Sequence, residues 1–266
     1  MNENIKIFDT HAHYDDERYI DDLDAVITDN YKSGVDKIVN VGCDIESSIK
    51  SMKLAKKYAH IYASIGLHPE VMEKSQHEIE REYKKLEDIL KNLSAQDKVL
   101  AIGEIGLDYH YTKDNKEMQK KYFMKQLELA KKYNLIVILH CRDVAEDMYN
   151  ILKDFSGLDG RIVLHCFQPN EKLARLVIER NFMIGIGGSI TYKRNDNSLN
   201  IIKSIPTKNM MLETDSPYLT PVPNRGKRNE SKNIAYVIKR LAEILEIGEE
   251  ILAKQLYDNS TNFFGV

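Results

Sequence analysis

Two histidines, His11 and His13, stand one residue apart at the end of a short apolar run, residues 5–11. Side chains two positions apart on a strand share a face, so both imidazoles are predicted to point the same way, together with Asp9. A buried carboxylate needs a partner, and divalent cations bind carboxylates and neutral imidazoles alike. The pair therefore predicts a metal site in which His11 and His13 hold one cation.

The same residue types recur at the ends of other apolar runs in the chain. A single histidine in such a place is most often structural, but a whole set at the ends of different strands is hard to obtain by chance. The predicted ligands are His11, His13, Glu104, His140, His165 and Asp215. Polar residues in similar positions are His68, Arg142 and Glu213. His60 and His77 are expected at the surface.

Six ligands exceed what one tetrahedral ion with an open position requires, and they suit two divalent cations about 3.5–4 Å apart. Glu104 is the predicted bridge, with His140 and His165 on the second cation. Asp215 is predicted both to bind metal and to accept the proton of the attacking water. Mixed imidazole and carboxylate ligation accommodates Mg, Mn, Zn or Ni. The chemistry predicted from the residues is that of a dinuclear hydrolase.

Eight short apolar runs are predicted to carry these residues as strands buried on both faces. They cover residues 5–11, 37–42, 61–66, 99–106, 136–141, 161–166, 182–188 and 210–215. Helical patterns lie between them, as at residues 77–93, where Ile79, Tyr83 and Leu86 fall on one face. This alternation predicts one α/β domain over residues 1–266, a (β/α)8 TIM barrel with the metal site at the C-terminal mouth of its strands.

A doubly wound open sheet is the competing fold. Against it, the first strand lacks a G-x-G-x-x-G turn, and polar residues end strands along the whole chain. Those ends converge on one mouth only in a barrel. Cys141 and Cys166 have the opposite parity to the neighbouring predicted ligands and are expected to pack toward the surrounding helices.

The composition of the 266 residues is that of a globular protein, with a net charge of −3. The charge does not favour general nucleic-acid binding, so an anionic substrate needs a local basic patch. Three cysteines without CxxC spacing indicate reduced thiols and a cytoplasmic location. We expect no signal peptide, no membrane span and no obligatory protein partner.

A basic loop follows the last predicted strand, where barrels often bind phosphate. Its cations are Arg225, Lys227, Arg228 and Lys232, and Arg225 and Arg228 are predicted to clamp a phosphodiester. Four tyrosines are candidates for stacking on bases of a single strand, although a core or rim position is at least as common: Tyr109, Tyr111, Tyr192 and Tyr218.

The motifs THAHYDDERY, IGLHPE, IGEIGLDYHY, HCRD, HCF, ETDSPYLTP and RGKRNE together resemble the TatD family of metal-dependent deoxyribonucleases, related to amidohydrolases. The resemblance runs from residue 10 to about residue 230. It implies a (β/α)8 barrel that uses divalent metals to cut DNA, often from a 3′ end, and the same six ligands. It further implies that His68 and Arg142 approach the substrate phosphate. The chain departs from the family pattern at Glu70, Gln168, Pro169 and Ser231.

The leading hypothesis is thus a deoxyribonuclease, a 3′–5′ exonuclease on single-stranded DNA. A second hypothesis keeps the site but hydrolyses an ester or amide, such as an aminoacyl-tRNA ester, because a barrel and its ligands do not fix the substrate. A third makes the metals structural, in a nucleic-acid-binding module without turnover.

Overall fold

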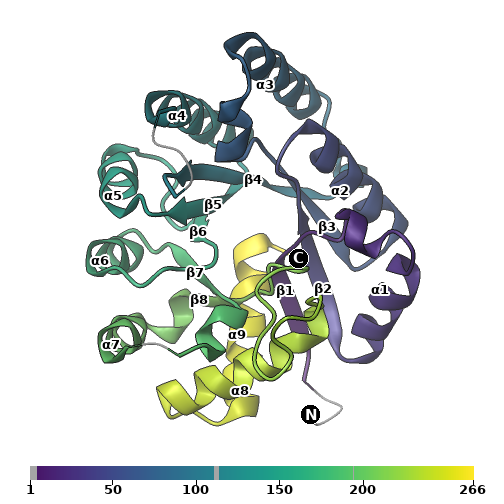
Figure 1. Cartoon of the computed structure of the whole chain (residues 1–266), viewed down its shortest axis with the longest axis vertical. Helices are drawn as coiled ribbons and strands as arrows, with labels where there is room; N and C mark the ends of the chain where they lie inside the picture. Colours follow the sequence, from purple (N-terminus) through teal and green to yellow (C-terminus); the bar gives the residue numbers. More distant parts are fainter. Residues whose placement is uncertain (1–4, 111–113, 194) are drawn as a thin grey trace.

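The chain folds into a barrel of eight parallel strands surrounded by helices, in a computed structural model that describes residues 5–110, 114–193 and 195–266 (Figure 1). Consecutive strands pair in the order β1 to β8, so the predicted (β/α)8 fold is confirmed. The strands are β1 Ile7–Ala12, β2 Val35–Val41, β3 Ile61–Ile65, β4 Val99–Asp108, β5 Ile136–Arg142, β6 Ile162–Leu164, β7 Met183–Ile186 and β8 Met210–Leu212. Each overlaps one predicted apolar run.

Helices cover the outside of the ring of strands (Figure 1). They are α1 Leu23–Lys32, α2 Ile45–Lys57, α3 Gln76–Lys91, α4 Lys116–Tyr133, α5 Ala145–Asp154, α6 Glu171–Glu179, α7 Asp196–Ser204, α8 Ile234–Leu245 and α9 Glu249–Phe264. Short 3₁₀ helices are η1 Glu17–Tyr19, η2 Pro69–Glu73, η3 Ala95–Asp97, η4 Gly188–Thr191, η5 Thr207–Asn209 and η6 Ser231–Asn233. Within the described ranges, no helix combines the length and apolar character needed to cross a membrane.

Local sequence explains where α3 begins and which face it buries. Ser75 accepts a hydrogen bond from the backbone N–H of Glu78, while the Glu78 carboxylate accepts one from the backbone N–H of Ser75, a capping box. Ile79, Tyr83 and Leu86 are buried against the barrel, as their spacing predicts. Such amphipathic helices hold the strands in a ring and leave the strand ends to carry the polar residues.

Two apolar layers make up the core. One lies between the strands and the helices, and the other fills the inside of the barrel. The inner residues include Phe8, Val39, Ala101, Ile138 and Met211, and Phe264 of α9 packs with its ring centroid 5.5 Å from that of Phe8. Apolar side chains therefore fill the barrel interior, and the cluster of imidazoles and carboxylates lies above them, at the C-terminal ends of the strands.

The strands do not follow a strict alternation everywhere. The pairing of β1 with β2 shifts register between Asp9 and Ala12, and the pairing of β4 with β5 shifts between Ile102 and Ile105. A register shift inserts a residue and changes which side chains face inward. Both shifts lie beside residues that are predicted metal ligands.

Candidate metal centre

His11 and His13 place two ring nitrogens against each other at the end of β1. Their Nε2 atoms are 3.0 Å apart, and the Nδ1 atom of His13 is 2.8 Å from the carbonyl oxygen of Val41. If the Nδ1–H of His13 donates to that carbonyl, its Nε2 carries a lone pair that faces the neighbouring imidazole. Asp215 brings its Oδ1 atom within 3.3 Å of the same Nε2. These three side chains surround a space that suits a cation.

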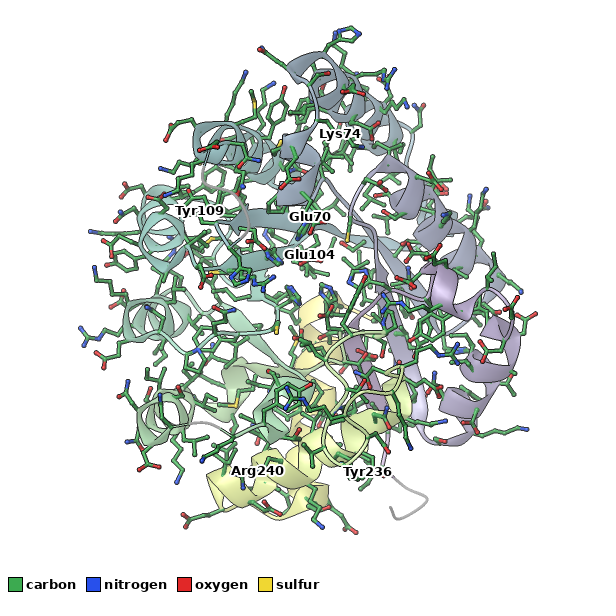
Figure 2. All side chains as sticks on the ribbon, viewed as in Figure 1. Glu70, Lys74, Glu104, Tyr109, Tyr236 and Arg240 are labelled. Atoms are coloured by element: carbon green, nitrogen blue, oxygen red, sulfur yellow. The ribbon has the colours of Figure 1, made fainter. Side chains whose placement is uncertain are left out.

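Glu104 of β4 lies between two sets of imidazoles and is labelled near the middle of the molecule in Figure 2. Its Oε1 atom is 2.7 Å from Nδ1 of His140 and 2.8 Å from Nε2 of His165. Its Oε2 atom is 3.5 Å from Nε2 of His11 and 3.9 Å from Nε2 of His13. The carboxylate thus occupies the position expected of a bridge.

The charges of this cluster are strongly coupled. Burial raises the pKa of the Glu104 carboxyl, but the surrounding imidazoles, His165 first among them, together hold it well below its usual range. Burial lowers the pKa of His140, yet hydrogen bonds to Asp108 and Glu104 raise it to about 9. Protons on imidazoles therefore balance the acids, and a cation would replace them because metal ligands must be deprotonated.

Several buried polar atoms of the cluster have no hydrogen-bond partner among the described residues, namely Nδ1 of His11, Nδ1 of His165 and Oε2 of Glu213. Buried polar atoms are normally paired, so such atoms call for an explanation. Four overlapping sets of side chains could each hold an ion: His11, His13 and Asp215; His11, His165 and Glu213; His13, Cys43 and Glu104; His68, Glu104 and His140. The donors present fit divalent cations.

His68 differs from the other imidazoles of the cluster. Its Nδ1 atom accepts a hydrogen bond from the backbone N–H of Glu70 at 3.2 Å, at the start of η2. A neutral imidazole that accepts through Nδ1 carries its proton on Nε2, which lies 3.7 Å from Oε1 of Glu104. Burial lowers the pKa of His68 to about 3, so the ring is neutral at ordinary pH. Its Nε2–H is therefore a donor directed toward the cluster.

Besides His68, three residues of the cluster were not among the predicted ligands. Asp108 Oδ2 lies 2.8 Å from Nε2 of His140, and Cys43 Sγ lies 3.7 Å from Oε2 of Glu104. Glu213, fully buried, accepts a hydrogen bond from the backbone N–H of Cys166, and burial raises its pKa to about 8. The sequence does place Glu213 at the end of the last strand, without a role as a ligand. Strand position could have indicated the other two, because Asp108 is four residues beyond Glu104 and Cys43 follows the end of β2.

Asp9 does not join the imidazoles, contrary to its predicted inward position. Its carboxylate accepts hydrogen bonds from the hydroxyls of Thr214 and Ser231, each at 2.6 Å, and from the backbone N–H of Thr214 at 3.0 Å. Phe8 faces into the barrel, so Asp9 faces outward, and the register shift after it returns His11 to the inside. The partner of this buried charge is a hydroxyl network, in which Ser231 takes part.

The basic residues are placed unequally. Arg142 ends β5, and its charge helps to lower the pKa of Asp108. Arg225 stacks on Tyr192, with its guanidinium carbon 4.4 Å from the ring centroid. Arg228 instead pairs with Asp22 and donates to the carbonyl oxygen of Arg18. The structure thus does not bring Arg228 to the cluster.

The four tyrosines proposed for base stacking differ in burial and in hydrogen bonding. Tyr109 is buried in the core and donates to Asp147, so it has the structural role. Tyr111 lies outside the described residues. The hydroxyl of Tyr192 donates to the carbonyl oxygen of Thr220 at 2.9 Å, whereas Tyr218 is 48 % exposed beside His13.

Cys141 packs against the outer core as predicted, and Cys166 is half-buried in a turn beyond β6.

A (β/α)8 barrel with imidazoles and carboxylates gathered at the C-terminal ends of its strands defines a metal-dependent hydrolase. Residues 8–265 match the family model described as TatD related DNase. The chain belongs to this family, as its motifs indicate.

The similarity to known proteins extends over nearly the whole chain. It is 38 % identical to an uncharacterized metal-dependent hydrolase, YabD of Bacillus subtilis, over 98 % of this chain and 99 % of that protein. It is 29 % identical to the 3′-5′ ssDNA/RNA exonuclease TatD of Escherichia fergusonii, with the same coverage. Among solved structures, YJJV, a TatD homolog from Escherichia coli K12, has a TM-score of 0.89 and 31 % identity, over 98 % of both chains.

Proposed function

We propose that this protein is a metal-dependent deoxyribonuclease that hydrolyses single-stranded DNA from its 3′ end. The observation that carries the proposal is the position of Glu104, whose two carboxylate oxygens face two separate sets of imidazoles. A relative with 29 % identity is named a 3′-5′ ssDNA/RNA exonuclease, which supports this substrate class.

Two divalent cations would be held by His11, His13 and Asp215 on one side and by His140 and His165 on the other, with Glu104 between them. When bound, such a pair supplies water of lowered pKa and positive charge for the phosphate oxygens. Mg, Mn, Zn and Ni are each compatible with this mixed donor set. Asp108 keeps the His140 ring in place through its hydrogen bond to Nε2.

The remaining steps belong to the protein's own side chains. Burial raises the pKa of Asp215, but its contact with His13 and the charges of nearby imidazoles lower it, so the carboxylate is ionised. It can take the proton of the water whose oxygen attacks phosphorus. The bond from phosphorus to the leaving ester oxygen breaks, and that oxygen takes up a proton from solvent. His68 would donate its Nε2–H to a phosphate oxygen, and Arg142 would attract the phosphate from the end of β5.

The test is digestion of an end-labelled oligonucleotide with Mg²⁺ or Mn²⁺. The wild-type protein should shorten a single strand from its 3′ end, and Asp215→Asn should lower the rate about 100-fold or more. Asp88→Asn is a matched control, because Asp88 is an exposed residue of α3 whose carboxylate pairs with Lys91 of the same helix. No shortening by the wild-type protein, or equal rates for wild type and Asp215→Asn, would refute the proposal.

A second candidate, hydrolysis of an ester or amide at the same site, is favoured by one observation. Arg228 and Lys232 are paired with Asp22, Asp29 and Glu230, so the basic loop presents less positive charge than its composition suggests. Arg225→Ala separates the candidates: it should slow cleavage of DNA several-fold and leave hydrolysis of a small neutral ester unchanged.

A further inference from the structure

Tyr218 stands beside the metal centre with a guanidinium on its ring. It lies three residues after Asp215, in the loop that follows β8. Its ring centroid is 6.3 Å from that of His13, and the two planes meet at 73°. The guanidinium carbon of Arg18 lies 4.3 Å from the ring centroid. One aromatic side chain therefore contacts both a predicted metal ligand and a cation from η1, the 3₁₀ helix that follows β1.

The backbone fixes this ring relative to the centre. The N–H of Tyr218 donates to the carbonyl oxygen of Asp215 at 2.7 Å, and its own carbonyl accepts from the side-chain amide of Asn229 at 2.8 Å. A residue held on both sides loses little further freedom when a ligand binds, which favours recognition. The ring is thus built into the site rather than carried on a free loop end.

Arg18 is held as firmly as the ring. Asp16 accepts hydrogen bonds from Nε at 2.8 Å and from Nη2 at 2.7 Å of Arg18, a two-point pairing that fixes the plane of the guanidinium. The hydrogen bond from Arg18 lowers the pKa of Asp16 to about 2, so the pair stays charged at working pH. A planar cation on an aromatic ring is a surface on which bases stack.

Exposure distinguishes Tyr218 from the other tyrosines near the mouth. Tyr218 is 48 % exposed, whereas Tyr109 is 6 % exposed and its hydroxyl is bonded to Asp147. Tyr192 is half-buried and tied to the carbonyl oxygen of Thr220. Val222, in the same loop as Tyr218, is also 48 % exposed. Apolar surface at the rim of a highly polar site is suited to a ligand with both apolar and anionic parts.

We propose that Tyr218 and Arg18 form a stacking platform for the terminal nucleobase of a single-stranded nucleic acid, next to the phosphodiester that is cut. The proposal rests on the function proposed above and names the feature that selects its substrate. A terminal base of a single strand is free to stack, whereas a paired base in a duplex is already stacked between its neighbours. Stacking accepts any base, so the platform selects single-stranded over duplex nucleic acid and does not select a particular sequence.

The first test measures stacking without turnover. The probe is a short oligonucleotide with 2-aminopurine at its 3′ end and phosphorothioate linkages that resist cleavage. The wild-type protein should quench the 2-aminopurine fluorescence on binding, and Tyr218→Leu should bind about tenfold more weakly, with little quenching. Tyr218→Phe, which keeps the ring, should match wild type within about twofold. Equal quenching by wild type and Tyr218→Leu would overturn the proposal.

Tyr236→Leu is the matched control. Tyr236 is 38 % exposed on α8 and is labelled in Figure 2 well away from Glu104, so its loss should not change binding or quenching. The thermal midpoints of all variants should agree with that of wild type, since both tyrosines lie at the surface. A Tyr236→Leu variant that loses quenching as Tyr218→Leu does would also overturn the proposal.

The second test separates this inference from the proposed function. Cleavage rates are compared for two oligonucleotides that differ only in whether the 3′-terminal residue carries a base or is abasic. Wild type should prefer the base-bearing end about tenfold, and in Tyr218→Leu the rates for the two ends should agree within about twofold. Cleavage without any preference in wild type refutes the platform and leaves the nuclease intact. Absence of cleavage with normal 2-aminopurine quenching refutes the nuclease and leaves the platform intact.

Discussion

At the scale of single residues, the histidines of the centre divide by the nitrogen that each leaves available. The Nδ1–H of His13 donates to the Val41 carbonyl, and its Nε2 faces the cluster. In His68, Nδ1 accepts from the Glu70 N–H, and the Nε2–H faces the cluster. A lone pair binds a cation and an N–H binds an anion. Imidazoles only a few ångströms apart therefore serve different partners.

This division predicts opposite results for two substitutions. His68→Asn keeps an acceptor for the Glu70 N–H, but its shorter side chain places no N–H at the position of Nε2, so kcat/KM should fall about 100-fold with unchanged metal content. His140→Asn should lower the bound metal itself. Metal analysis of both purified variants, alongside the oligonucleotide assay, checks the assignment. A His68→Asn protein that loses metal to the same extent would show that His68 is a ligand.

At the scale of elements, the close approach of β7 and β8 depends on a glycine. A Cβ at Gly185 would lie 1.9 Å from Oε2 of Glu213, a fully buried side chain. Gly185→Ala should therefore lower the free energy of unfolding by about 1–3 kcal/mol, measured by urea denaturation. Gly248→Ala is the control, because the nearest atom to its Cβ, on Ile251, is 3.9 Å away. Equal free energies of unfolding for the two variants would mean that the Glu213 side chain moves away from the added Cβ at little cost.

A second prediction at this scale concerns the turn that leads into β4. A hydrogen bond from Lys56, with others from the backbone and hydroxyl of Ser94, lowers the pKa of Asp97 to about 2. A lowered carboxyl pKa adds stability above pH 3.8, and this stability is lost as pH falls toward 2. Asp97→Asn should thus destabilise the protein at pH 7 and much less at pH 2.5. A difference from wild type that does not shrink in acid would contradict this.

The elements themselves were predictable because strands buried on both faces leave apolar runs that need no tertiary information. The same alternation puts His140 and His165 on the inner face, because each lies two residues after an inner residue of the barrel, Ile138 and Val163. It failed at Asp9, because the register of β1 shifts just beyond it and a shift leaves no mark in one sequence. The pairing of Arg228 with Asp22 was also out of reach, since 206 positions separate them.

At the scale of the whole molecule, metal content and stability are linked. A cation that binds only the folded chain stabilises it, by about 2.7 kcal/mol at a hundredfold excess over Kd. Removing metal with EDTA should abolish hydrolysis and lower Tm by roughly 5–10 °C, and adding Mn²⁺ back should restore both. Calorimetry with and without chelator tests this. If EDTA lowers Tm but the metal-loaded protein shows no turnover, the metals have a structural role instead.

The ring of strands is joined differently at one place. In the described part of the chain, seven ladders link β1 through β8. The segment after β8 meets β1 through one bridge, between Ala12 and Ser216, and through bonds such as Asp215 N–H to the His11 carbonyl, at 2.9 Å. A cation shared by His11 and Asp215 would fasten this junction from the inside. Amide protons of β1 and of residues 213–216 should then exchange with solvent sooner in the chelated protein, marking where the cylinder first opens.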